Sequence, residues 1–164
     1  MPINFVAGDI FATPLMSFPA LAHGCNCKGK MGKGIAVMFR EMWPEMYDLY
    51  NRLCREGTFR PGNVMHWQSD GFGDPHVFNL FTQDHWKDKA TLAAIEQAVL
   101  DMIEIMEEQE IPTVTMPRIG AGLGGLPWAE VRDLLVRIGE DAPRRLIVVE
   151  DYVHGKALHP KSRN

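Results

Sequence analysis

Two glycine-rich loops, one near each end of the chain, constrain its fold more than any other feature. The first is residues 23–36 and the second is residues 117–128. Each loop follows a short apolar run and precedes an amphipathic segment, which is the order strand, loop, helix. Glycines let backbone N–H groups approach an anion, and a helix N-terminus adds partial positive charge. Two such loops indicate a ligand with more than one anionic or polyhydroxyl group, such as a nucleotide diphosphate.

Apolar runs and amphipathic segments alternate along the whole chain, which predicts an α/β layered domain with a largely parallel sheet. Glycine- and proline-rich residues 71–75 predict a hairpin between two strands, so the sheet should be mixed. The predicted strands are 3–7, a segment from 21, 63–67, 76–81, 112–116 and 146–149. The predicted helices are 34–39, a segment from 44, 87–109 and a segment from 127. We expect one domain over residues 1–153 and a flexible C-terminal tail over 154–164.

The composition and charge of the chain limit the classes of partner that it is expected to bind. The chain has 164 residues, 46% hydrophobic and 23% charged, which is ordinary for a single globular domain. A net charge of -4 argues against a general nucleic-acid-coating surface. No apolar run is long enough to cross a bilayer, so no membrane partner is expected. Three cysteines fit a reducing cytoplasm, and we expect a cytoplasmic monomer. Lysines 28, 30 and 33 lie in the first loop, where they either meet phosphates or are merely solvated.

Two polar residues sit where predicted strands end. Asp9 follows the first strand, where its carboxylate either accepts a hydrogen bond from an exocyclic amine such as that of adenine or caps a turn. Asn26 lies at the mouth of the first loop, where its amide either holds sugar hydroxyls or forms an Asx turn. If the ends of these strands converge at one edge of the sheet, Asp9, Asn26 and both loops lie together.

Nearby histidines and acids supply candidates for proton transfer. His23, Cys25 and Cys27 alternate, but three ligands in one strand give poor tetrahedral geometry, so buried thiols are favoured and no metal is expected. His23 stays a candidate for proton transfer at neutral pH. In the segment after the 76–81 strand, Asp84 or His85 could act as a general base and Gln83 could position a water. The same segment could equally be the N-terminal cap region of the next helix.

Three motifs in this order resemble the macro domains, the ADP-ribose-binding modules, over residues 3 to about 149. The motifs are Gly8-Asp9-Ile10, then residues 23–27 with 31–36, and then residues 116–123. The resemblance is closest to the branch that holds the terminal ADP-ribose protein glycohydrolase and the DNA ADP-ribosyl glycohydrolases. It extends to the yeast-type ADP-ribose 1″-phosphate phosphatases through residues 23–27. It implies a three-layer α/β/α macro domain with a mixed, mostly parallel central sheet.

The resemblance also implies a role for particular residues. Asp9 and Ile10 would hold adenine, Asn26 and residues 31–35 would line the distal ribose, and the 119–123 backbone would cradle the diphosphate. Tyr152 is a candidate for stacking on adenine. The predicted ADP-ribose-binding residues are Asp9, Ile10, Asn26, Met31, Gly32, Gly34, Ile35, Thr82, Ile119, Gly120, Ala121, Gly122 and Leu123.

Two positions depart from this branch. Its glycohydrolases carry a nucleophilic lysine directly after the threonine that corresponds to Thr82, and this chain has Gln83 there. The protein glycohydrolase has an aspartate where this chain has Gly124. A carboxamide forms no adduct with an anomeric carbon, so a covalent lysine mechanism is not expected.

The expected function is therefore a mono-ADP-ribosyl hydrolase that acts on modified protein carboxylates (Glu/Asp) or DNA nucleobases by substrate-assisted water attack. It would need no cofactor. The catalytic candidates are Asn26, Gln83, Asp84 and His23. Two alternatives remain: a phosphatase for ADP-ribose 1″-phosphate, which His23 favours, and a non-catalytic ADP-ribose reader, which the changes at Gln83 and Gly124 favour.

Overall fold

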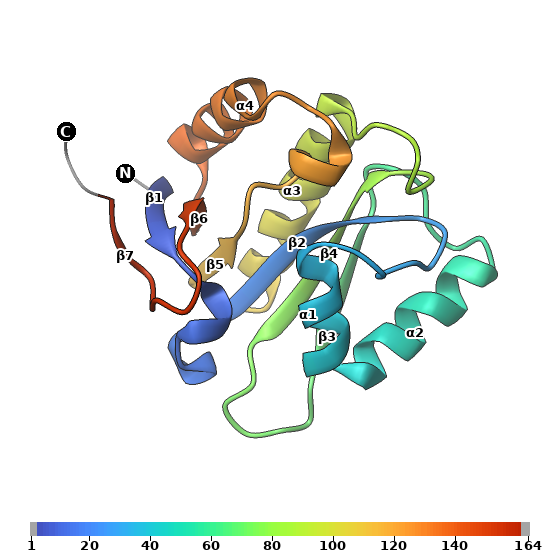
Figure 1. The fold of residues 1–164 in the computed structure, drawn as a ribbon, viewed down its shortest axis with the longest axis horizontal. Coiled ribbons are helices and arrows are strands. Elements are labelled where there is room, and N and C mark those ends of the chain that lie inside the picture. Colours follow the sequence, from blue (N-terminus) through green and yellow to red (C-terminus); the bar gives the residue numbers. More distant parts are fainter. Residues whose placement is uncertain (1–2, 162–164) are drawn as a thin grey trace.

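A seven-stranded mixed sheet forms the centre of the molecule in a computed structural model that describes residues 3–161 (Figure 1). The strand order is β3-β4-β2-β5-β6-β1-β7, with antiparallel pairing only at the two edges, β3 with β4 and β7 with β1. The strands are β1 (Ile3–Gly8), β2 (Ala20–Asn26), β3 (Val64–Gln68), β4 (His76–Gln83), β5 (Thr113–Met116), β6 (Arg145–Tyr152) and β7 (His159–Pro160). The helices are α1 (Ile35–Met42), α2 (Pro44–Arg55), α3 (Leu92–Glu108) and α4 (Trp128–Asp141).

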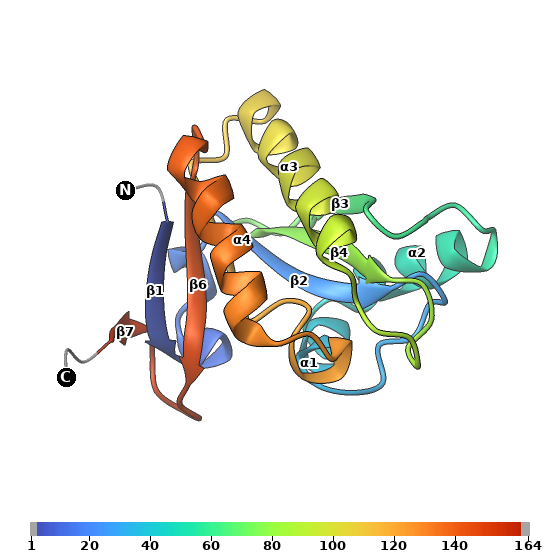
Figure 2. The same cartoon turned by 90° about the horizontal axis from the view of Figure 1, so that it is seen from above.

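Helices cover both faces of this sheet, so the predicted three-layer α/β/α arrangement is confirmed (Figure 2). One apolar core lies between the sheet and α3 with α4, and a second lies between the sheet and α1 with α2. Strands β2 and β4 are buried along almost their whole length. Their continuous apolar runs follow from this two-sided cover, because both faces of each strand need apolar side chains.

The long third helix begins five residues later than its periodicity predicts. Thr91 caps it by accepting a hydrogen bond from the Ala94 N–H at 3.1 Å, and the helix starts at Leu92 rather than at 87. The residues before it form a loop instead. The Ala90 N–H donates to the Gly124 carbonyl at 2.8 Å, which ties this loop to the second glycine loop. The competing hydrogen bonds of the cap and the loop thus displace the start of the helix.

The described part of the predicted tail, residues 154–161, contacts the domain. β7 pairs with β1, and the Leu158 N–H donates to Thr13 Oγ1 at 3.0 Å. Lys161 forms ion pairs with Glu150 and Asp151. The sequence predicted a tail because this segment has no apolar pattern. Its contacts are backbone pairing and ion pairs, which do not require apolar residues. The rest of the predicted tail, 162–164, lies outside the described residues. Within residues 3–161, no helix combines the length and the hydrophobicity needed to cross a membrane.

Candidate functional site

A groove of two adjoining chambers lies at the carboxyl ends of the parallel strands. The Gln83 chamber has a volume of about 550 Å³ and is lined by residues such as Asn26, Thr82 and Gln83. The Asp9 chamber has a volume of about 840 Å³ and is lined by residues such as Asp9, Ile10 and Tyr152. The residues that line both chambers are Gly34, Ile35, Pro117, Arg118, Ala121 and Gly122. Because these shared residues belong to the two glycine loops, the chambers form one groove with the loops at its waist.

Backbone N–H groups are concentrated at this waist. Among residues 3–161, the N–H groups of 120–123 and of 32–36 have no hydrogen-bond partner. Gly34, Gly120 and Gly122 have φ angles of 64°, 75° and 62°, which side chains rarely adopt. The loops approach each other so closely that a Cβ on Gly34 would lie 3.3 Å from Leu123 Cδ1. With the N-terminus of α1 at Ile35, the waist offers donors and partial positive charge to an anion.

The Asp9 carboxylate faces the second chamber and also caps a turn. Its Oδ1 accepts the Phe11 N–H at 3.0 Å, at the start of the 3₁₀ turn Ile10–Ala12. Its Oδ2 accepts the Gly155 N–H at 3.1 Å and the Tyr152 hydroxyl at 3.5 Å. Both roles considered for Asp9 are therefore compatible, because a carboxylate has further lone pairs to offer a ligand.

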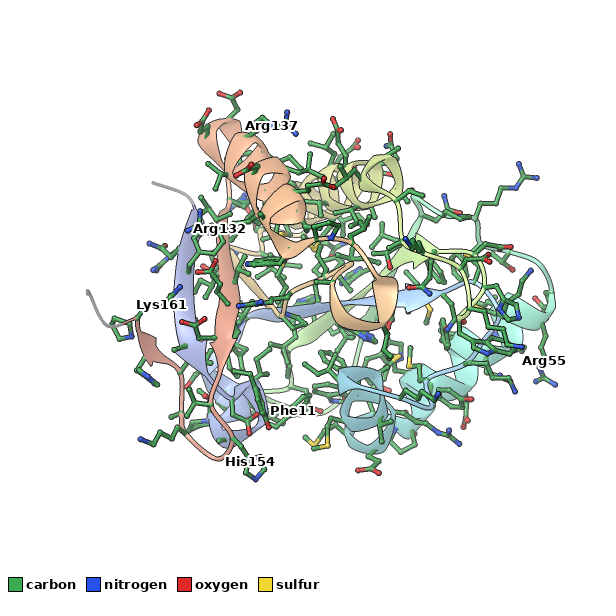
Figure 3. All side chains as sticks on the ribbon, turned by 45° about the horizontal axis from the view of Figure 1, so that its top comes forward. Phe11, Arg55, Arg132, Arg137, His154 and Lys161 are labelled. Atoms are coloured by element: carbon green, nitrogen blue, oxygen red, sulfur yellow. The ribbon has the colours of Figure 1, made fainter. Side chains whose placement is uncertain are left out.

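Aromatic and polar side chains surround Asp9 in this chamber. The side chain of Tyr152 is 68% exposed and lines the chamber beside Asp9. Phe11 and His154 line it too, and Figure 3 shows them close together at one end of the molecule. The Ile10 N–H has no partner among residues 3–161. A planar base could therefore meet an aromatic ring, a carboxylate acceptor and a free N–H donor in one place.

Asn26 lines the Gln83 chamber, but most of its amide shapes the first loop. Its Nδ2 donates to the Lys30 carbonyl at 2.9 Å, and its Oδ1 accepts the Lys28 N–H at 3.0 Å and the Tyr50 hydroxyl at 3.1 Å. The Asx-turn interpretation thus describes its geometry. One Nδ2 hydrogen is left to donate to a ligand.

Gln83 presents an open acceptor in the same chamber. Its Nε2 donates to the His85 carbonyl at 3.1 Å and to the Asp88 carbonyl at 3.0 Å, which fixes the amide. Its Oε1 has no hydrogen-bond partner among residues 3–161 and points to Gly124, where a Cβ would lie 3.7 Å away. An amide oxygen held in this way can orient a water but is too weak a base to deprotonate it.

His23 lies outside both chambers, so the structure does not bring this predicted catalytic residue to the groove. It is fully buried beneath α1, stacked on Phe39 with ring centroids 4.0 Å apart, and it lines neither chamber. Its Nε2 lies 2.7 Å from Asn79 Oδ1, and burial lowers its pKa to about 4 despite this hydrogen bond. Since the carbonyl-type oxygen of Asn79 only accepts, the imidazole is neutral with its proton on Nε2.

Two further predicted residues lie outside the chambers. The Asp84 side chain is about half exposed and pairs with Lys28 Nζ at 3.5 Å, away from the chamber lining. Met31 is buried in the α1–α2 core. In both cases the residue next to it in sequence lines the chamber instead, which is the alternation expected in extended backbone. His85, the other candidate base of that segment, also lines neither chamber, and the remaining predicted residues each line at least one.

Sequence reasoning did not single out two of the lining residues, Arg118 and Trp86. Arg118 borders both chambers, where its Nε donates to the Glu150 carbonyl and its guanidinium lies 5.4 Å from the centre of the Trp128 ring. Trp86 lines the Gln83 chamber. The signal available for both was position, since each lies within or beside a segment already assigned to the site. Lys30 and Lys33, two of the lysines that the sequence offered as phosphate contacts, also line the Gln83 chamber.

Comparison with known proteins assigns this chain to a family. Residues 22–135 match the model of the Macro domain family. The chain is 33% identical over 142 residues to the DNA ADP-ribosyl glycohydrolase of Mycobacterium tuberculosis, covering 86% of this chain and 40% of that protein. It is 29% identical over 160 residues to the ADP-ribose 1″-phosphate phosphatase of Meyerozyma guilliermondii, covering 81% of this chain and 91% of that protein.

Solved structures agree with this placement. The macrodomain of Mycobacterium tuberculosis DarG superposes with a TM-score of 0.80 at 31% identity, covering 92% of this chain and 96% of that one. The chain spans about two fifths of the length of the curated glycohydrolases that it matches. The fold, the two-chambered groove and these similarities together show that the chain belongs to the macro domain family.

Proposed function

We propose that this domain binds ADP-ribose along the groove and hydrolyses the bond between its distal ribose and an acceptor on DNA. The observation that carries the proposal is the pair of chambers joined by unpartnered backbone N–H groups. ADP-ribose has the same order of parts: a nucleoside, a diphosphate and a second ribose. Both chambers have volumes typical of small-molecule sites.

The chemistry of the chambers sets the direction of the ligand. The Asp9 carboxylate can accept a hydrogen bond from the exocyclic amine of adenine, and the Ile10 N–H can donate a hydrogen bond to a ring nitrogen. With adenine in the Asp9 chamber, the diphosphate meets the N–H groups at the waist, and the distal ribose occupies the Gln83 chamber. Arg118, at the border of the two chambers, adds positive charge beside the diphosphate.

Bond cleavage in this site uses a positioned water. The bond from the anomeric carbon to the acceptor breaks, a water oxygen bonds to that carbon, and the proton lost by water ends on the acceptor. The transition state resembles an oxocarbenium ion, so a weak nucleophile suffices when it is correctly placed. Gln83 Oε1 is the open acceptor that can orient this water, and the diphosphate of the substrate lies where it can stabilise positive charge on the ribose.

The names of the relatives support DNA as the acceptor. The relatives named DNA ADP-ribosyl glycohydrolases are 29% and 33% identical to this chain, which favours a modified DNA base over a protein carboxylate. The test uses two substrates, a DNA oligonucleotide with one mono-ADP-ribosylated base and a peptide with one ADP-ribosylated glutamate. Chromatography should show free ADP-ribose released from the oligonucleotide by the purified domain. No release from either substrate, with ADP-ribose still bound in calorimetry, would establish a reader and overturn the hydrolase.

A phosphatase for ADP-ribose 1″-phosphate is the second candidate. The similarity to fungal enzymes of that name supports it, because this chain spans 91% of their length. That substrate would place its terminal phosphate in the Gln83 chamber. The buried position of His23 removes the residue that favoured this activity in the sequence. Phosphatase activity would be the main function if inorganic phosphate is released from ADP-ribose 1″-phosphate faster than ADP-ribose is released from the oligonucleotide.

A further inference from the structure

An exposed tryptophan that stacks on a partly buried histidine lies at the Gln83 chamber. Trp86 lines the chamber and is 44% exposed, and its ring stacks on His85 with centroids 3.7 Å apart. Its indole Nε1 has no hydrogen-bond partner among residues 3–161. A tryptophan that is held by a neighbouring ring and left open to solvent provides a flat surface for another ring to stack on.

Two segments, the one that contains this pair and one that is hydrogen-bonded to it, are rich in lysine although the chain as a whole is acidic. Residues 28–33 and 84–89 together carry five lysines and two aspartates, in a chain whose net charge is -4. The two segments are joined, because the Cys27 N–H donates to the Asp84 carbonyl at 2.8 Å and Lys28 pairs with Asp84. We call this surface the Trp86 rim; its members are His85, Trp86, Lys28, Lys30, Lys33, Lys87 and Lys89.

We propose that the Trp86 rim binds the DNA strand on either side of the modified nucleotide, with an unpaired neighbouring base stacked on Trp86. This inference rests on the proposed function, since it takes the distal ribose to lie in the Gln83 chamber. The acceptor is then at the mouth of that chamber, directly beside Trp86. The lysines face the strand's phosphates, which a peptide acceptor lacks. Stacking needs a base outside the duplex, so the surface favours single strands.

Binding rather than turnover tests this surface. The probes are a single-stranded oligonucleotide with one mono-ADP-ribosylated base, the matching duplex, and free ADP-ribose. Trp86→Ala should weaken binding of the modified single strand by roughly 5- to 100-fold, the loss expected for one stacked base. Its effect on free ADP-ribose should be at least fivefold smaller, and Trp86→Phe should restore most of the strand affinity. Equal losses for the strand and for free ADP-ribose would overturn the proposal, as would tighter binding of the duplex.

The lysines have a separate signature in the salt dependence. Lys87→Gln and Lys89→Gln should each reduce the slope of log affinity against log salt concentration by about 0.7 for the single strand. Arg137→Gln is the matched control, because it removes one exposed positive charge near the opposite end of α4 from the second glycine loop, and it should leave the slope unchanged (Figure 3). Unchanged slopes in both lysine variants would contradict phosphate contacts.

A peptide with one ADP-ribosylated glutamate separates the two kinds of acceptor. If Trp86→Ala weakens binding of the peptide as much as binding of the single strand, the Trp86 rim does not recognise nucleic acid and the proposal fails. These readouts do not depend on catalysis. Absence of ADP-ribose release would overturn the hydrolase while the binding comparison still decides the role of the rim.

Discussion

Gln83 is the residue that we propose to position the reacting water. Its amide is fixed by two backbone carbonyls, and its free oxygen faces the chamber assigned to the distal ribose. Gln83→Ala should lower the turnover number for ADP-ribose release by about 10- to 100-fold, as expected when a group that positions the reacting water is lost. ADP-ribose affinity, measured by calorimetry, should change much less than turnover. A variant with unchanged turnover would remove Gln83 from the mechanism.

Because the Gln83 amide cannot form a covalent intermediate, we expect no covalent adduct on the protein during turnover. Intact-mass analysis of the protein during turnover, with borohydride present to trap any imine, should show only the unmodified mass. A mass increase equal to ADP-ribose less one water and plus two hydrogens, the reduced adduct, would reveal a nucleophile that the mechanism proposed above does not contain. Lys30 and Lys33 would then be the residues to substitute, because both line the chamber.

Buried His23 makes the stability of the fold depend on pH. Burial lowers its pKa to about 4, below the 6.5 of the unfolded chain, so between these values the unfolded state binds more protons. The free energy of unfolding should therefore rise as the pH increases from about 4 to 6.5, with a contribution of about 3 kcal/mol from this residue. Denaturant unfolding at a series of pH values measures it. His66 and His76 also have lowered pKa values, so the comparison is with His23→Leu, whose pH dependence should be visibly weaker. The same slope in both proteins would contradict the assignment.

At the scale of the element, the two glycine loops decide binding. Gly122 has a φ of 62° and no heavy atom within 4 Å of an added Cβ, so a side chain there would project into open space at the waist of the groove. Gly122→Val should lower ADP-ribose affinity at least tenfold. Gly57→Val is the matched control, because Gly57 has a φ of 72°, equally open surroundings and a place just after α2, outside both chambers.

Both glycine variants should lose about 1–2 kcal/mol of stability from backbone strain. Only the Gly122 variant should lose ADP-ribose binding in calorimetry. If the two lose affinity equally, the effect is general destabilisation, and the waist is not the anion site.

The elements themselves were largely predictable, and the exceptions have identifiable causes. Strands β1 to β6 and the helical faces were predicted from apolar runs and helical periodicity, and the hairpin from glycine- and proline-rich residues 71–75. Strand β7 was not predicted, because its two residues are exposed and carry no apolar pattern. The start of α3 was wrong because a threonine cap and a loop hydrogen bond outweigh helical periodicity. Of the site, the lining by Asp9, Asn26 and the glycine loops was foreseen from the motifs. The buried position of His23 could not be predicted, because the sequence does not show that Phe39 stacks on it.

At the scale of the whole molecule, the C-terminal segment belongs to the binding site. The Asp9 N–H donates to the Lys156 carbonyl at 2.7 Å, and its carboxylate accepts the Gly155 N–H. Lys161 anchors the end of the segment through the buried carboxylate of Glu150, which Trp128 and Arg132 also contact. These hydrogen bonds hold the pKa of Glu150 at about 2 although its burial alone would raise it.

Removal of residues 154–164 should therefore weaken ADP-ribose binding by about thirtyfold, because Asp9 loses two backbone partners worth roughly 1 kcal/mol each. Adenosine monophosphate should lose affinity by the same factor, since the segment contacts only the Asp9 chamber. Lys161→Met, which keeps the backbone pairing of β7, should show a smaller loss of the same kind. Calorimetry with both ligands measures the three proteins. An unchanged affinity in the truncated protein would show that the segment is only structural.

The most direct test of the central claim, that one groove binds ADP-ribose from end to end, is an amide ¹H–¹⁵N spectrum recorded during titration. ADP-ribose should shift the signals of Ile10 and Tyr152, of residues 119–123 and 32–36, and of Gln83. Adenosine monophosphate should shift the signals of the Asp9 chamber and the waist and leave Gln83 in place. Shifts confined to one chamber with ADP-ribose, or no shifts at the glycine loops, would contradict the account.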